Sequence, residues 1–170
     1  MAQRPELTPA LCGKENAYLE KNSDSKFVKM MKYYLPKHKI VDSFEQLPDD
    51  VFFKFTVDVP KEKTLSTVDE INEKFAGRVF ATSSGFGNFD LILPHVNKAV
   101  GLEKMLASWN LTLDDLVAFG DGRNDLEMLK AAGLSYAMEN GSDEVKKVAD
   151  KIAPNNNDSG VLKVLADYLM

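Results

Sequence analysis

From about residue 97 onwards, short apolar stretches alternate with segments in which apolar residues recur at helical spacing. Residues 116–119 and 134–138 are the apolar stretches, and each is only long enough for a buried strand. Strands of this kind, separated by helices, are typical of a parallel sheet that helices cover. This part of the chain therefore predicts an α/β fold. The expected helices cover residues 97–109, 123–132, 143–149 and 159–169, and another short apolar segment covers 151–153.

The preceding residues show a different pattern. Over 51–59, apolar side chains alternate with charged or hydroxyl side chains, as in a strand with one buried face. Residues 79–83 and 89–93 predict two more strands, and the two glycines between them suit a hairpin turn. Helices are expected over 24–35, with Ser23 or Asp24 as the N-cap, and over 61–75.

Apolar stripes in the expected helices predict the face that each helix buries. In the helix at 24–35, one side consists of Phe27, Met30, Met31, Tyr34 and Leu35. The other two stripes consist of Leu65, Val68, Ile71 and Phe75 in the helix at 61–75, and of Leu102, Met105, Leu106 and Trp109 in the helix at 97–109.

The change of pattern after Pro94 predicts two domains within the 170 residues. Residues 1–94 are expected to form an α+β domain, and residues 95–170 an α/β domain with helices beside a parallel sheet.

Charge and cysteine content exclude several classes of protein. The net charge of −5 disfavours nonspecific nucleic-acid binding, so we expect no nucleic-acid partner. A single cysteine, Cys12, forms no intrachain disulfide, and with only two histidines the chain cannot build a four-cysteine or two-cysteine, two-histidine zinc site. No apolar run reaches the roughly 18 residues of a membrane span. We therefore expect a reduced, cytoplasmic protein with no membrane partner.

The segment Phe119–Met128 contains two aspartates, Asp121 and Asp125, with the amide of Asn124 between them. Ligands of open α/β sheets bind beyond the carboxyl ends of the strands, which is where Asp121 falls. Asn124 and Asp125 fall in the first turn of the next helix, whose free N–H groups favour anions. A carboxylate pair in this position suits Mg²⁺ that holds a phosphate.

The alternative for these residues is a purely structural role. Asp121 would then be only the N-cap of the following helix, and Asp125 only a favourable charge near its N-terminus. Gly120 and Gly122 favour the ligand site, because glycine lets the backbone turn sharply or approach a ligand closely.

Lys98 lies in the first turn of the helix expected at 97–109, where the helix dipole disfavours a cation. That cost is tolerable if the ammonium group faces a phosphate and an acidic metal site. The alternative is a solvated surface lysine, as most lysines are.

The segment Gly120–Met128 resembles motif IV of the haloacid dehalogenase superfamily, and is most similar to the Cof-type sugar-phosphate phosphatases. Three other segments resemble this branch in the same order along the chain. They are Asn97-Lys98-Ala99 (Ser-Lys-Gly in the branch), residues 137–141 (Ala-Met-Gly-Asn-Ala) and residues 155–161 (Asn-x-x-x-Gly-Val). The resemblance implies a partial Rossmann-type core and part of an α+β cap.

The resemblance also implies a function, that of a Mg²⁺-dependent phosphohydrolase of small phosphorylated metabolites. In this family pattern Asp121 and Asp125 are metal ligands, and Lys98 and Asn124 bind phosphate. Lys98 and Asp125 are the catalytic residues that the pattern retains in this chain.

The cap of such a phosphatase closes over the site and selects the substrate. Phe86, Asn88 and Asp90 are candidates for cap residues near the substrate. The alternative is that they are hairpin residues that touch no ligand.

The nucleophile of the family is missing from the 170 residues. Family members attack phosphorus with the first aspartate of an early Asp-x-Asp-x-Thr/Val motif, and the second aspartate acts as acid and base. No Asp-x-Asp occurs here, and Asp49-Asp50 and Asp114-Asp115 are adjacent pairs in expected connections. We therefore expect the C-terminal part of a longer phosphatase, inactive alone. Missing strands would leave a free sheet edge and apolar helix faces, which predicts self-association or pairing with the missing N-terminal half.

Two other functions stay open. In the first, the chain is a nonenzymatic binding or regulatory module derived from such a phosphatase. This function predicts no phosphate hydrolysis even with added Mg²⁺. In the other, a separate chain supplies the nucleophile, which predicts Asp121-dependent activity when the two halves are mixed.

Overall fold

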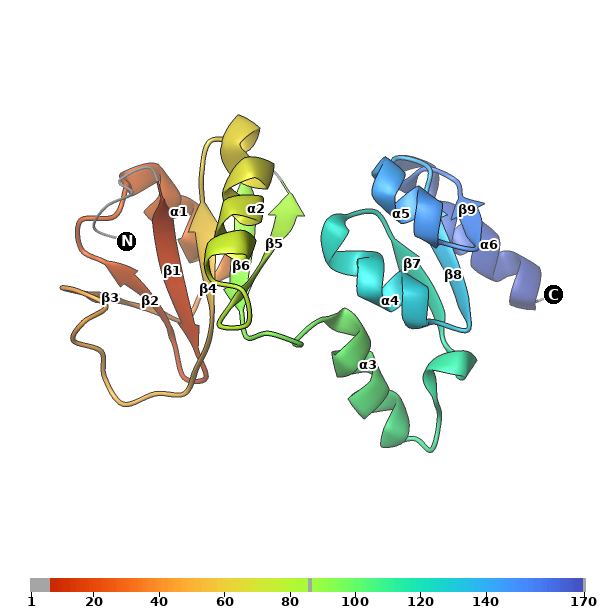
Figure 1. The fold of residues 1–170 in the computed structure, drawn as a ribbon, viewed down its shortest axis with the longest axis horizontal. Helices are drawn as coiled ribbons and strands as arrows, with labels where there is room; N and C mark the ends of the chain where they lie inside the picture. Colours follow the sequence, from red (N-terminus) through yellow and green to blue (C-terminus); the bar gives the residue numbers. More distant parts are fainter. Residues whose placement is uncertain (1–6, 86, 170) are drawn as a thin grey trace. The chain divides into compact units, whose positions relative to one another are not determined.

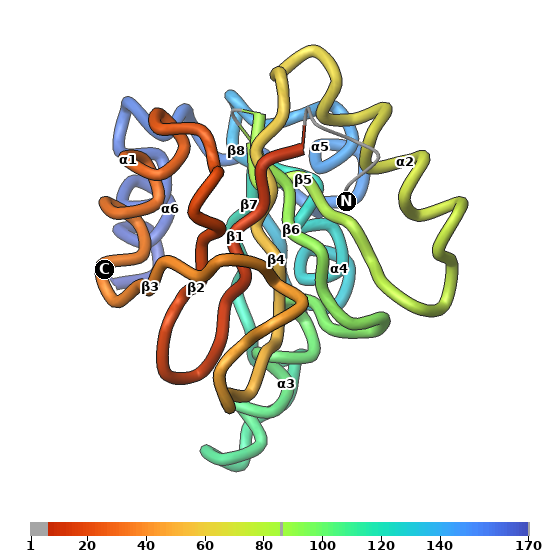
Figure 2. The backbone as a smooth tube through the Cα atoms, turned by 90° about the vertical axis from the view of Figure 1, so that its left-hand side faces the viewer, coloured from red at the N-terminus to blue at the C-terminus, as the bar shows by residue number. Residues whose placement is uncertain are grey.

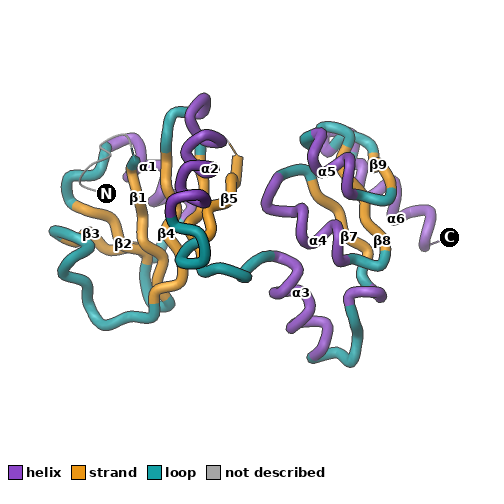
Figure 3. The backbone as a smooth tube through the Cα atoms, in the orientation of Figure 1, coloured by secondary structure: helices purple, strands orange, loops and turns teal. Residues whose placement is uncertain are grey.

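The computed structural model describes residues 7–85 and 87–169, and the chain divides into two compact units between Pro94 and His95. We call the residues up to Pro94 unit 1 and those from His95 unit 2. Each unit has a sheet of its own with flanking helices (Figures 1 and 3). This architecture confirms the α/β fold class.

Unit 1 contains a six-stranded mixed sheet in the order β3-β2-β1-β4-β6-β5. β2 and β3 run parallel, and all other neighbours are antiparallel. The elements are β1 (Thr8–Gly13), β2 (Ala17–Glu20), α1 (Ser25–Tyr34), β3 (His38–Val41), β4 (Phe52–Asp58), α2 (Thr64–Lys74), β5 (Phe80–Gly85) and β6 (Asn88–Ile92). The expected strands and hairpin of unit 1 are thus present as β4, β5 and β6.

The two helices of unit 1 cover opposite faces of its sheet (Figure 2). α1 packs Phe27 against Ala10 of β1, and α2 packs Val68 against Val57 of β4. Ala10 pairs with Thr56 in the ladder, so it lies on the face opposite Val57. α2 therefore covers one face of β4, and the other face of β4 lies on the same side of the sheet as α1.

α1 begins at the predicted cap. The Asp24 carboxylate accepts hydrogen bonds from the amides of Lys26 (2.8 Å) and Phe27 (3.1 Å), which satisfies two N–H groups that have no partner inside the helix. The helix ends before Pro36, whose ring cannot continue it.

The buried face of α2 differs from the predicted stripe. Val68 is buried, but Leu65 and Phe75 are exposed, and Thr64 and Thr67 are buried instead. The threonines share a face with Val68 because residues three and four apart are neighbours on a helix. The predicted stripe was therefore right for Val68 and for Ile71, which packs against the same core, and wrong for Leu65 and Phe75.

Unit 2 contains a three-stranded parallel sheet in the order β7-β8-β9, as its alternating pattern predicted. Leu129 and Val145 cover one face beside Ala118 and Ala137. Val161 and Val164 cover the other face beside Tyr136 and Met138. The elements are α3 (Lys98–Ala107), β7 (Val117–Gly120), α4 (Leu126–Ala131), β8 (Leu134–Met138), α5 (Asp143–Val148), β9 (Lys151–Ala153) and α6 (Gly160–Leu169).

The predicted apolar stripe of α3 is only partly buried. Ala99 and Leu106 are buried, whereas Met105 is 42% and Trp109 60% exposed. α3 packs against α4 and against the 3-10 turn Leu113–Asp115, and these neighbours leave Met105 and Trp109 exposed. The prediction that the whole stripe is buried was therefore wrong for Met105 and Trp109.

The helices of both units are short. The longest described helix, α2, has 11 residues, and within residues 7–85 and 87–169 no helix is long and apolar enough to cross a membrane.

Candidate functional site

The candidate site forms where β7 ends. The strand stops at Gly120, the next residues make a 3-10 turn over Arg123–Asp125, and α4 begins at Leu126. We predicted one helix from residue 123, but its first turn is the tighter 3-10 form. Asn124 and Asp125 lie in this turn, and Asp121 lies directly beyond the strand.

Asp125 is the most enclosed polar group of the site, with only 4% of its surface exposed. Its Oδ2 accepts hydrogen bonds from the backbone amides of Asp121 (2.9 Å) and Gly122 (3.1 Å). Its Oδ1 accepts a hydrogen bond from the Lys98 ammonium group in a close ion pair. Asp125 therefore ties the start of α3 to the loop beyond β7.

Glycine is required at position 120 by the closeness of this carboxylate. A Cβ atom there would lie 2.6 Å from the Asp125 Cβ and 3.0 Å from its Cγ. No real Cβ contact is that short, and Asp125 is held in place by three hydrogen bonds. Gly120 thus allows the aspartate to fold back over the end of its own strand.

Lys98 is the first residue of α3. The Asn97 side chain caps the helix by accepting a hydrogen bond from the Val100 amide (3.0 Å). About half of the Lys98 side chain is exposed, although its ammonium group pairs with Asp125. This ion pair compensates for the unfavourable position of a cation in the first turn of a helix.

The pKa of Asp125 results from opposing effects. Burial acts to raise it, but the hydrogen bond from Lys98, those from the two amides and the lysine charge together lower the pKa below its ordinary value of 3.8. The carboxylate is therefore ionised at neutral pH, and it neutralises one positive charge in the site.

This lowered pKa predicts an acid-sensitive unit 2. A carboxylate whose pKa is lower in the folded than in the unfolded protein stabilises the fold above its unfolded pKa, and this contribution is lost as the pH falls through its folded pKa. We expect the free energy of unfolding, measured with urea and Trp109 fluorescence, to decrease between about pH 5 and pH 2. Asp150 in the same unit also has a lowered pKa because of hydrogen bonds from Ser135.

Asp125→Asn is the control that separates the contribution of Asp125 to acid sensitivity from that of Asp150. The variant should be less stable at neutral pH, but its stability should change less over the same acidic range. An equal slope in both proteins would contradict the assignment to Asp125.

Asp121 and Asn124 differ from Asp125 in their surroundings. The Asp121 side chain is exposed, and its carboxylate has no hydrogen bond or ion pair with the described residues. The structural alternative for Asp121 was an N-cap, but the residue that precedes the 3-10 turn is Gly122. Asn124 is half-buried, and its Oδ1 lies so close to Gly122 that a Cβ at that glycine would be 3.0 Å away.

A second loop lies beside the first. The Ser142 amide donates to the Asp121 carbonyl oxygen (3.0 Å), which joins the loops that follow β8 and β7. Glu139 and Asn140 in turn accept from the amides of Asn155 (3.2 Å) and Asn156 (2.9 Å). Hydrogen bonds therefore join the segments 137–141 and 155–161 directly, and Ser142, the residue after the first of them, joins it to the segment 120–128.

The donor set of this edge fits Mg²⁺, which binds oxygen ligands and usually takes only one or two protein carboxylates together with water and phosphate oxygens. Asp121 offers a free carboxylate, and Asp125 lies four residues further on. Within residues 7–85 and 87–169 no group of three or more acidic, histidine or cysteine side chains is placed to hold a metal. At this edge the described residues therefore offer a metal two neighbouring aspartates, Asp121 and Asp125.

The sequence did not reveal all the polar contacts of the two units. Arg123 pairs with Glu144 at 2.9 Å, which connects the 3-10 turn to α5. In unit 1, Lys54 of β4 pairs with Asp90 of β6 at 3.2 Å. The signal in the sequence that could have indicated the Lys54 contact was the regular polar side of residues 51–59.

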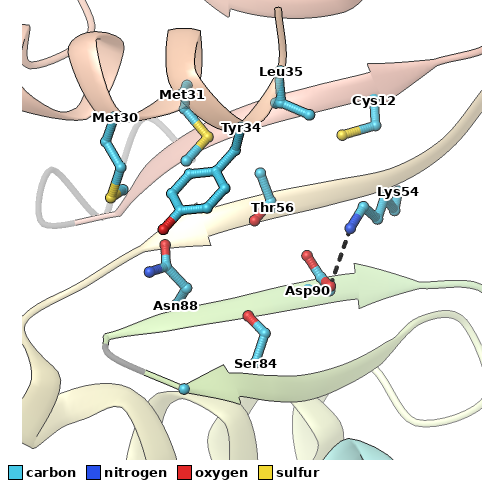
Figure 4. A pocket seen from close by; sticks show the side chains of 11 residues that line it. Cys12, Met30, Met31, Tyr34, Leu35, Lys54, Thr56, Ser84, Asn88 and Asp90 are labelled. Atoms are coloured by element: carbon cyan, nitrogen blue, oxygen red, sulfur yellow. Dashed lines mark hydrogen bonds and ion pairs between the residues drawn. The ribbon is translucent and has the colours of Figure 1, made fainter.

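Of the three cap candidates, Asn88 and Asp90 lie on β6, and Phe86 lies outside the described residues. Asn88 and Asp90 line a pocket between α1 and the sheet of unit 1 (Figure 4).

Comparison with known proteins places these features in a family. Residues 2–165 match the family model described as haloacid dehalogenase-like hydrolase. The chain is 37% identical over 166 residues to the 5-amino-6-(5-phospho-D-ribitylamino)uracil phosphatase YbjI of Escherichia coli K12. The aligned residues cover 98% of this chain and 61% of YbjI.

Solved structures show the same fold. The SMU.1108c protein of Streptococcus mutans UA159 superposes with a TM-score of 0.89 at 41% identity, over 99% of this chain and 63% of that protein. The HAD subclass IIB sugar phosphatase BT4131 superposes with a TM-score of 0.81 at 19% identity, over 98% of this chain and 62% of the other. The chain thus spans about three-fifths of the length of these proteins.

Proposed function

This chain belongs to the haloacid dehalogenase-like hydrolases, and we propose that it forms the phosphate- and Mg²⁺-binding part of a phosphatase that acts on small phosphorylated metabolites. The observation that carries the proposal is the network around Asp125. It holds Lys98 and the 120–122 backbone together and leaves the Asp121 carboxylate exposed at the carboxyl end of a parallel strand. Such crevices are where open α/β sheets bind their ligands.

Each residue has a separate task in this proposal. Asp121 is the principal metal ligand, and Mg²⁺ when bound supplies positive charge to the phosphate oxygens. The Lys98 ammonium and the Asn124 amide hold the phosphoryl group. Asp125 contributes its charge to the metal site and keeps Lys98 and the strand end in place. We assign unit 1 as cap and unit 2 as part of the catalytic core.

The covalent step needs a group that these residues do not supply. No Asp-x-Asp occurs in the 170 residues, so the nucleophile of the proposed phosphatase must come from outside them. We propose that the chain pairs with a polypeptide that carries it. The exposed Trp109 and Met105 and the position of β7 at one end of the sheet support such pairing, because exposed apolar surface and unpaired strand edges favour association.

The relatives suggest a first substrate. YbjI of E. coli and YitU of Bacillus subtilis, the latter 42% identical over 79 residues, are both named as 5-amino-6-(5-phospho-D-ribitylamino)uracil phosphatases. We propose this phosphorylated metabolite as the first compound to assay.

Complementation tests the proposal. The chain is mixed with the part of the S. mutans protein that it does not cover, and Mg²⁺-dependent phosphate release is measured while size-exclusion chromatography reports pairing. We expect activity only in the mixture, and a loss of about a hundredfold or more in Asp121→Asn, since the variant weakens the binding of the Mg²⁺ that would stabilise the charge of the phosphoryl group. Asp114→Asn is the matched control, because Asp114 is an exposed carboxylate before β7, at the other end of that strand.

The absence of Asp-x-Asp also favours a second candidate, a nonenzymatic binding module. It predicts that Mg²⁺ and phosphate bind to the chain and that Asp121→Asn weakens this binding, but that no mixture hydrolyses a phosphate ester. Co-elution of the two polypeptides without turnover would overturn the phosphatase proposal in favour of this module. Self-association would appear as a larger species of the chain alone.

A further inference from the structure

Two polar contacts join the start of α5 to the loop that carries Asp121. The Ser142 amide donates a hydrogen bond to the Asp121 carbonyl oxygen (3.0 Å). The Glu144 carboxylate pairs with Arg123, with 2.9 Å between Oε2 and Nε. A Cβ atom on Gly141 would lie 3.1 Å from the Asp121 Cα, so the two backbones are in direct contact. The loop is therefore held at several points by α5 and the residues just before it.

α5 is itself anchored in the core of unit 2. Val145 is fully buried and packs in the same cluster as Leu129 of α4. The Lys146 amide donates to the Ser142 carbonyl oxygen (3.2 Å), which joins Ser142 to the helix. α5 also packs against α4 and the 3-10 turn before it (Figure 1). A contact with α5 therefore connects the Asp121 loop to the rigid part of the unit.

Hydrogen bonds on both sides fix the backbone of Asp121. Its N–H group donates to Asp125 Oδ2 (2.9 Å), and its C=O group accepts from the Ser142 amide (3.0 Å). These two groups belong to the peptide planes that flank the Asp121 Cα, so together they restrict both backbone dihedrals of this residue. The Cα–Cβ bond then has a fixed direction, and the exposed carboxylate extends from a fixed point.

The Arg123–Glu144 pair is too exposed to contribute much to the stability of unit 2. The two side chains are 33% and 49% exposed, and such ion pairs stabilise weakly because water solvates both partners. Arg123 begins the 3-10 turn that contains Asn124 and Asp125. Loss of the pair should therefore loosen the loop and this turn without unfolding the unit.

We infer that the start of α5 positions the metal-binding loop, and that Glu144 does so through Arg123. Glu144 is a positioning residue, because its carboxylate acts on Arg123 and the metal ligand in this assignment is Asp121. The inference rests on the proposed function, which assigns Asp121 to Mg²⁺. A looser loop presents the Asp121 carboxylate in more directions, so less of the protein is in the conformation that binds the metal.

Charge alone predicts a different result from positioning. Removal of the negative charge of Glu144 weakens the attraction of Mg²⁺, whereas removal of the positive charge of Arg123 strengthens it. If the pair positions the loop, both removals weaken Mg²⁺ binding, since each breaks the same contact. The Arg123 variant therefore distinguishes the two explanations by the direction of its effect.

A Mg²⁺ titration of the full chain, followed by NMR through the amide shifts of residues 120–125, tests the inference. We expect Glu144→Gln and Arg123→Met each to weaken Mg²⁺ binding about fivefold. The double variant should bind no more weakly than Arg123→Met alone, because the two residues act as one unit. Asp143→Asn is the matched control, since it removes an exposed carboxylate from the same turn of α5, and it should change Mg²⁺ binding by less than about twofold.

Amide hydrogen exchange gives a second readout that needs no metal. The amides of Asp121 and Gly122, which donate to Asp125, should exchange several-fold faster in Glu144→Gln, while urea unfolding of unit 2 stays unchanged. Tighter Mg²⁺ binding by Arg123→Met, equal effects of Glu144→Gln and Asp143→Asn, or unchanged exchange rates would each overturn the inference. The absence of Mg²⁺-induced shifts in the wild type would overturn the proposed function itself, whereas wild-type binding that Glu144→Gln leaves unchanged would overturn only the positioning role.

Discussion

Replacement of Asp125 with alanine is expected to lower the free energy of unfolding of unit 2 by about 2–4 kcal/mol. The variant leaves the amides of Asp121 and Gly122 without their acceptor and removes the counter-ion of Lys98. Lys98 is half exposed and can turn into water, so the loss of the acceptor of the two part-buried amide hydrogen bonds accounts for most of the cost. Urea unfolding measured by the fluorescence of Trp109, the single tryptophan, reports on this unit.

Asp121→Ala is the control for that measurement. It removes the same chemical group four residues earlier, but the Asp121 carboxylate is exposed and has no described partner. Its effect on unfolding should stay within about 0.5 kcal/mol, whereas its effect on Mg²⁺ binding should be large. Similar destabilisation by both substitutions would contradict the assignment of Asp125 as the carboxylate that positions the loop and of Asp121 as the carboxylate that binds the metal.

Replacement of Gly120 with alanine should destabilise unit 2 by about 1–3 kcal/mol. The new methyl group would lie 2.6 Å from the Asp125 Cβ, and relief of this clash requires the carboxylate to leave Lys98 and the amides. We therefore expect metal and phosphate binding to weaken together with stability. Urea unfolding and a Mg²⁺ titration of the same sample measure both effects.

The same substitution at Gly101 should have the opposite sign. Gly101 lies within α3, and a Cβ atom there would meet nothing within 4 Å. Alanine is favoured over glycine inside a helix, so Gly101→Ala should stabilise unit 2 by about 0.5–1 kcal/mol. A loss of stability at both glycines would show that an added methyl group destabilises unit 2 even where the structure leaves room for it, and would remove the evidence for a specific clash at Gly120.

Local patterns predicted the elements that local forces determine. The Asp24 cap places the start of α1, and the apolar runs predicted at 116–119 and 134–138 form the neighbouring parallel strands β7 and β8. β3 was not predicted, because it is short and its burial shows no alternation that a sequence pattern could reveal. Its pairing with β2 depends on contacts between distant residues, which no short window contains.

The role of Asp125 was predicted only in part. Its position beyond a strand indicated a functional carboxylate, but the three hydrogen bonds depend on how the backbone folds back and on a lysine 27 residues earlier. Of the residues that line the pocket between α1 and the sheet of unit 1, only Asn88 and Asp90 were singled out in the sequence as candidates for ligand contact. The polar side of β4 is indistinguishable in sequence from a solvent-facing side, and only the position of α1 beside it creates an enclosed space.

The two sheets differ in how far along the chain their partners lie, and this difference bears on the order in which they form during synthesis. In unit 1, Thr8 pairs with Asp58 and Lys54 pairs with Ile92, so most of the unit must leave the ribosome before its sheet is complete. In unit 2, Val117 pairs with Leu134 and Tyr136 with Lys151, which are much shorter separations. Long separations slow folding because the chain loses entropy before the contacts form. Although unit 1 is synthesised first, we therefore expect its sheet to form late. β1 cannot pair with β4, nor β4 with β6, until the later strand of each pair has been translated.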